Sequence, residues 1–121
     1  MITGRVENRQ ALIPITYRLP GQPDLIIEHV VDTGFSGQLT LPASAIAAMG
    51  LLFDQWRSVN LANDSSDQVA FHRATIVWEG QEFVAEVIAT GTRPLFGTAL
   101  MDRKELVIQF DNNGLMTLDD F

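Results

Sequence analysis

Turn-forming residues divide this chain into short segments, and their spacing constrains the fold more than any other feature. Clusters of proline, glycine, asparagine, aspartate and serine interrupt the sequence at residues 20–24, 63–67 and 111–114. Such clusters between apolar segments are typical of strands joined by tight turns. The sequence therefore predicts a mostly β fold.

The segments between these turns have strand-like patterns. Apolar residues alternate along residues 11–19, which predicts a strand with one buried face. Residues 25–31 form a nearly continuous apolar run and predict a buried central strand. Residues 38–41 predict another short strand, and the Asn-Gly pair at residues 113–114 indicates a hairpin turn.

Further elements complete the expected domain. Residues 42–50 predict a short helix, with proline in its first turn and glycine at its end. One or two helical turns are also expected between residues 97 and 104. The expected hairpins pair residues 58–62 with 68–72, 73–78 with 82–88 around Gly80, and 105–110 with 115–118.

Length and composition limit the classes of protein to consider. The 121 residues, 46% of them hydrophobic, are enough for a single domain over residues 1–121 with its own core. A net charge of −7 disfavours nucleic-acid binding, and no apolar stretch is long enough to span a membrane. No secretory signal is recognisable at the N-terminus, so we expect a cytoplasmic protein.

The most informative motif is Asp32-Thr33-Gly34, which follows the apolar run directly. A carboxylate at the end of a strand can activate a water molecule. A hydroxyl beside it can fix the loop by hydrogen bonding, and glycine permits close backbone approach and unusual φ values. For an isolated tripeptide of this kind, a turn that ends a strand is the strongly favoured interpretation.

A second motif changes this interpretation. Pro94-Leu95-Phe96-Gly97 places two bulky apolar residues before a glycine, and a helix-like stretch follows. The order of the two motifs and the hairpins between them resembles the retropepsin family of aspartic proteases over residues 12–110. The small bacterial members are the most similar, because their loop often reads Asp-Thr-Gly-Phe-Ser-Gly. The resemblance implies a single-lobe fold, closed and β-barrel-like, with a flap hairpin and one or two short helices.

The resemblance also implies a homodimer. Aspartic-protease chemistry uses two carboxylates that share one proton, and this chain has a single Asp-Thr-Gly motif. The second catalytic Asp32 would therefore come from another copy across a twofold axis. Thr33 and Gly34 would support the active-site loop, with the Thr33 hydroxyl bonding across the axis. The expected reaction is peptide-bond hydrolysis, with no cofactor and no metal.

Substrate contacts are expected from a flap and from apolar pocket residues. The flap tip lacks the glycines of the viral enzymes, and Phe35 replaces the usual alanine or serine, where it could line a pocket or pack. Leu95 and Phe96 would shape pockets or, as the preferred interpretation, fill the core. The flap and pocket candidates are Phe35, Asn63, Asp64, Ser65, Ser66, Leu95 and Phe96.

Other chemistries have weaker support. The two histidines, His29 and His72, do not have metal-ligand spacing, and there are no cysteines. His29 lies in the apolar run, where a structural role is expected. An alternative function is a catalytically silent dimerisation or peptide-binding module of the same fold, because a fold does not determine an activity.

Overall fold

The computed structural model describes residues 1–60 and 65–121. In these residues the chain is mostly β, as the sequence predicted, with one α-helix and one 3-10 helical turn. In chain order the elements are β1 (Ile2–Glu7), β2 (Gln10–Arg18), β3 (Leu25–Val31), β4 (Leu39–Leu41), α1 (Ala43–Met49), β5 (Leu52–Asn60), β6 (Ser66–Trp78), β7 (Gln81–Ala89), β8 (Leu95–Phe96), η1 (Thr98–Leu100), β9 (Lys104–Ile108) and β10 (Leu115–Asp120).

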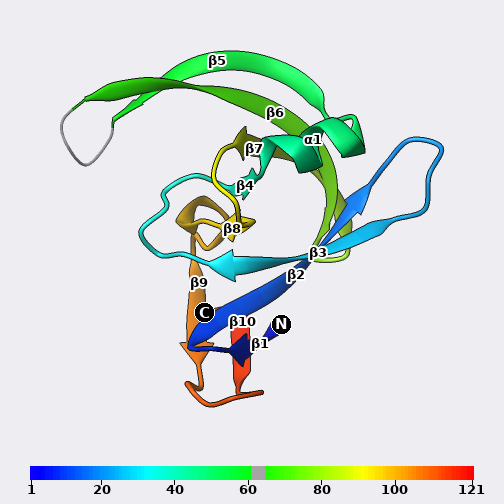
Figure 1. Ribbon diagram of the computed structural model, residues 1–121. Coiled ribbons are helices and arrows are strands. Elements are labelled where there is room, and N and C mark those ends of the chain that lie inside the picture. Colours follow the sequence, from blue (N-terminus) through cyan, green and yellow to red (C-terminus); the bar gives the residue numbers. More distant parts are fainter. Residues whose placement is uncertain (61–64) are drawn as a thin grey trace.

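All the described strands belong to one sheet (Figure 1). Its strand order is β5-β6-β7-β4-β8-β3-β2-β1-β10-β9. Most neighbours are antiparallel, but β3 pairs with β8 and β4 pairs with β7 in parallel. The short strand β8 therefore lies between β3 and β4, and this arrangement positions the loop that joins them.

The expected closed, barrel-like arrangement is wrong for this sheet. An additional antiparallel pairing joins β2 to β6, so the middle of the sheet folds back on itself. The end strands β5 and β9, however, do not pair with each other in the described part of the chain. The physical reason is that β5 pairs only with β6, while β1, β10 and β9 continue the sheet beyond β2.

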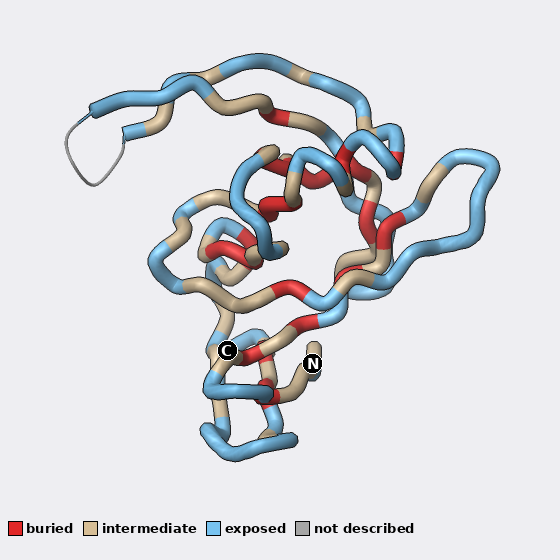
Figure 2. The backbone as a smooth tube through the Cα atoms, in the orientation of Figure 1, coloured by how far each residue is buried: buried red, intermediate tan, exposed pale blue. Residues whose placement is uncertain are grey.

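The core lies within the folded-back part of the sheet. The predicted alternation along β2 is confirmed, because Ala11, Ile13, Ile15 and Tyr17 are all buried. Met116 and Leu118 of β10 extend the cluster, which is otherwise completed by buried residues from β4, α1, β6, β7, β8 and η1. Figure 2 shows these buried segments near the centre, whereas the outer part of the β5–β6 hairpin is mostly exposed.

Strand β3 has the predicted bounds but not the predicted burial. Leu25 and Ile26 are 40% and 64% exposed, and His29 is the only fully buried residue of the strand. One cause is the shortness of β8, which pairs with β3 only at Val30 and Val31. The first part of β3 therefore has β2 as its single strand neighbour.

The local signals for α1 and the hairpins were reliable. Helix α1 follows Pro42 and ends at Gly50, whose φ of 66° is left-handed. The three expected hairpins are present. One difference is that β6 is continuous over 13 residues. It is the second strand of the first hairpin and the first strand of the second hairpin. The expected helical turns after Gly97 reduce to η1.

Candidate active site

Asp32 begins the loop between β3 and β4, which we call the Asp32 loop (residues 32–38). Its backbone N–H donates to the carbonyl oxygen of Phe96 at 2.9 Å, continuing the parallel pairing of β3 and β8 by one residue. The N–H of Phe35 donates to the carbonyl of Asp32 at 3.1 Å and closes a turn. Asp32 is half-buried, and its backbone is fixed on both sides.

The Asp32 carboxylate is oriented by its own loop. Its Oδ1 accepts a hydrogen bond from the Gly34 N–H at 2.9 Å. A Cβ on Gly34 would lie 3.2 Å from this oxygen, so glycine leaves room for the contact. Gly34 does not have a positive φ. Glycine is therefore suited to this position because it lacks a side chain, and not because of an unusual backbone conformation. Oδ2 accepts no hydrogen bond from a described residue and is open to a water molecule.

Gly97 packs against the Asp32 loop. Its N–H donates to the carbonyl of Gln38 at 2.8 Å, and the Thr98 N–H donates to the carbonyl of Phe35 at 2.8 Å. A Cβ on Gly97 would lie only 2.1 Å from the carbonyl oxygen of Gly37. A side chain at position 97 would therefore push the two segments apart.

The apolar candidate residues divide between core and surface. Phe96 is buried, and its ring centroid lies 5.5 Å from that of Trp78, so it is a packing residue. Leu95 is half-buried and lines a hollow beside Asp32. The Phe35 ring lies over Gly37 and Gly97 within the loop region, where it packs.

The hollow beside Asp32 has a volume of about 430 Å³. Asp32 and Thr33 form part of its wall, and Leu95 and Phe110 contribute apolar surface. Thr33 is exposed, and its hydroxyl has no hydrogen-bond partner within residues 1–60 and 65–121. The Thr33 hydroxyl is therefore free to bond to a molecule outside this chain.

The expected flap residues are described only in part. Asn63 and Asp64 lie outside the described residues. Ser65 and Ser66 are both exposed, and Ser66 pairs with Asn60 where the two strands of the hairpin meet.

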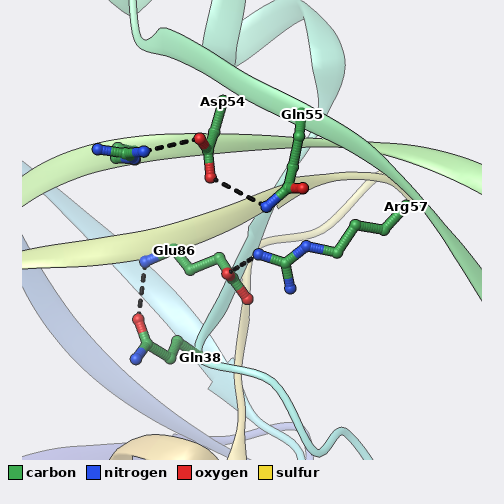
Figure 3. Close-up of polar contacts among 6 residues, drawn as sticks. Gln38, Asp54, Gln55, Arg57 and Glu86 are labelled. Carbon is green, nitrogen blue, oxygen red and sulfur yellow. Dashed lines mark hydrogen bonds and ion pairs between the residues drawn. The ribbon is translucent and has the colours of Figure 1, made fainter.

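A polar chain links the Asp32 loop to the arm of this hairpin (Figure 3). The Gln38 side-chain oxygen accepts from the Glu86 backbone N–H at 2.7 Å, and the Glu86 carboxylate binds the Arg57 guanidinium at 2.6 Å. Arg57 also lies 4.0 Å from the ring centre of Phe71. The two contacts of Glu86 join residues 29 and 48 positions apart, and no sequence spacing could have revealed them.

An ion pair lies beside this chain on the same strands. Asp54 on β5 accepts a hydrogen bond from Arg73 on β6 at 2.7 Å. This bond is the main cause that holds the pKa of the Asp54 carboxyl below its usual value. The pair is partly exposed, so its contribution to stability is small.

His29 has the structural role that its position predicted. Its ring is fully buried, with Nε2 2.8 Å from the Tyr17 hydroxyl and Nδ1 3.0 Å from the carbonyl of Ile27. Because that carbonyl can only accept, Nδ1 carries the proton and Nε2 accepts from Tyr17. Burial lowers the pKa of the imidazole to about 4. Both nitrogens are occupied, which leaves none for catalysis.

In the described residues, no group of three or more histidine and acidic side chains is arranged to hold a metal ion. Within the same ranges, no helix has the length and apolar character needed to cross a membrane. Comparisons with models of known protein families, with curated proteins and with solved structures found no match to this chain. Any function must therefore be inferred from the geometry of the site.

Proposed function

We propose that this chain is one subunit of a homodimeric, retropepsin-type aspartic endopeptidase. The observation that carries the proposal is the state of the Asp32 carboxylate. It sits at a strand end, is oriented through one oxygen by Gly34, and leaves the other oxygen open beside a hollow. A carboxylate held in this way suits the activation of water.

The proposed reaction needs Asp32 from each of two copies. One carboxylate is ionised and removes a proton from a water molecule, which attacks the peptide carbonyl carbon. The other carboxyl is protonated and donates to the carbonyl oxygen, giving a tetrahedral intermediate. A proton then passes to the departing amine as the C–N bond breaks. Because the pair must hold one proton, activity should be higher on the acid side of neutrality.

Exposed apolar residues at the C-terminal hairpin support self-association. Val107 and Leu115 are each nearly half exposed, and the register of β9 and β10 places them on the same face. Phe110 follows β9, is 70% exposed and lines the hollow beside Asp32. A second copy that covered these side chains would bury apolar area and bring its own loop close.

Asp32→Asn tests the proposal, because asparagine keeps the side-chain shape and removes the base. Wild-type protein and this variant would be incubated with a mixed peptide library at mildly acidic pH, and new termini would be counted by mass spectrometry. We expect cleavage by the wild type and none by Asp32→Asn. Asp102→Asn is the matched control, because Asp102 is exposed and lies outside the site. Cleavage that survives in Asp32→Asn would contradict the assignment.

A mixing experiment tests the shared site. Wild-type and Asp32→Asn subunits would be combined at a fixed total concentration and allowed to exchange. If both carboxylates are needed, activity should fall as the square of the wild-type fraction. Activity proportional to the wild-type fraction would show that each subunit works alone. A dimer that binds peptides but cleaves none would point to the binding-module alternative.

A further inference from the structure

The hollow beside Asp32 carries positive charge as well as apolar surface. Arg9, from the turn between β1 and β2, and Arg93, from the segment before β8, both line it. Its volume of about 430 Å³ lies within the range of roughly 300–1,000 Å³ that is usual for ligand pockets. Two arginines therefore line a hollow whose wall also includes Asp32.

These two arginines differ from most of the basic residues in the chain. The net charge is −7, and five of the eight basic side chains form ion pairs with acidic ones: Arg5, Arg18, Arg57, Arg73 and Lys104. In the described residues, Arg9 has no ion pair, and Arg93 bonds only to the neutral side-chain oxygen of Gln10. Both charges therefore stay available to a carboxylate from outside the chain.

The backbone at both arginines is fixed. Asn8 and Arg9 form a two-residue turn with φ values of 50° and 63°, closed by the pairing of Glu7 with Gln10. The carbonyl of Pro94, next to Arg93, accepts the Val30 N–H at 2.9 Å. The two side chains are thus exposed but attached to positioned backbone, as a recognition site requires.

We propose that this hollow binds an acidic side chain, glutamate or aspartate, of the peptide substrate close to the bond that is cleaved. The inference rests on the proposed function, and it specifies the substrate class of the same site. An arginine recognises a carboxylate through paired, charge-assisted hydrogen bonds. Two guanidinium groups also offset the repulsion that Asp32 would exert on an acidic residue. Leu95 supplies apolar contact for the methylene groups of the substrate side chain.

The test begins with a parent peptide that the wild-type protein cleaves, found by digesting a mixed library. In a synthetic series, glutamate or glutamine would occupy each position within three residues of the scissile bond. We expect kcat/KM to favour glutamate at one position by about tenfold, since one charge-assisted contact is worth about that factor. Arg93→Gln and Arg9→Gln should each reduce this ratio, and the double variant should bring it close to one.

The control is Arg103→Gln. Arg103 is exposed, has a positive φ like Arg9, and does not line the hollow. It should leave the glutamate-to-glutamine ratio unchanged. High salt should lower the ratio for the wild type, because screening weakens exposed charge pairs.

The possible failures are distinguishable. If peptides are cleaved but glutamate and glutamine are equivalent at every position, the inference is wrong and the proposed function stands. A weaker dimer in Arg93→Gln, seen by sedimentation, together with an unchanged ratio at concentrations where the dimer still forms, would make this arginine an interface residue and overturn the inference. If no peptide is cleaved, the proposed function fails. Fluorescence anisotropy of labelled glutamate and glutamine peptides on the Asp32→Asn protein would then decide the pocket chemistry by itself.

Discussion

The buried pair of His29 and Tyr17 predicts a loss of stability in mild acid. The pKa of His29 falls from 6.5 to about 4 in the folded protein, chiefly because burial penalises the charged imidazolium. The unfolded chain therefore binds a proton between these two pH values while the folded chain does not. The stability from this group is complete above pH 6.5 and is lost as the pH falls toward 4.

The magnitude follows from the shift. A difference of 2.5 units between the two pKa values corresponds to about 3 kcal/mol, because one unit is worth about 1.4 kcal/mol. At pH 4.5 most of this, about 2.5 kcal/mol, should already be lost. The pKa values of Asp54 and Asp120 are lowered from 3.8, so these carboxylates act mainly below this window. The proposed reaction should be faster in mild acid, so the fold would weaken in the pH range where that proposed chemistry improves.

Urea denaturation at pH 7.0 and pH 4.5, followed by tryptophan fluorescence, measures the effect. The control is the double variant Tyr17→Phe/His29→Leu, which replaces both hydrogen-bonding partners by apolar groups and leaves no buried polar atom of the pair. We expect the wild type to lose about 2.5 kcal/mol between the two pH values and the double variant to lose far less. Equal losses in the two proteins would refute the role of His29. Protein concentration must be constant, because a dimer couples stability to concentration.

Three further predictions concern the Asp32 loop. Gly97→Ala should destabilise the fold by more than about 2 kcal/mol in urea titrations, because the new Cβ would lie 2.1 Å from the Gly37 carbonyl oxygen. Gln38→Leu should cost about 1–3 kcal/mol by the same method, because the Glu86 N–H loses its acceptor, while Gln38→Glu should keep most of the stability. Thr33→Ala should weaken the proposed dimer by about 1 kcal/mol in sedimentation and leave the urea midpoint of the monomer unchanged; a dimer of wild-type strength would exclude a hydroxyl bond across the axis.

Local elements were predictable because their signals lie within a few residues. The alternation over residues 11–19 is a direct consequence of strand geometry, and β2 follows it. Pro42 and Gly50 mark the two ends of α1 through their backbone preferences. Asp32 could be singled out for the same reason, because Thr33 and Gly34 follow it directly in the sequence.

Features that depend on distant pairing were not predictable. The exposure of Leu25 depends in part on how far β8 extends beside β3. The length of β8 cannot be read from the apolar run at residues 25–31. The contact of Gln38 with Glu86 requires the parallel pairing of β4 and β7. Arg9 and Arg93 come together only because a turn and a distant loop meet at the same hollow.

The late position of β8 in the sequence has a consequence for the growing chain, because β8 and the residues after it hold the Asp32 loop. Phe96, Gly97 and Thr98 supply the hydrogen bonds that hold this loop. Thr98, for example, lies more than 60 residues after its partner Phe35 in the sequence. A ribosome exposes the N-terminal part first, so Asp32 emerges long before the residues that orient its backbone. Contacts of such large separation form late, because a long loop must close before they are made. Unfinished or C-terminally truncated chains would thus carry Asp32 without the contacts that orient it, and the proposed hydrolysis would begin only after synthesis is nearly complete.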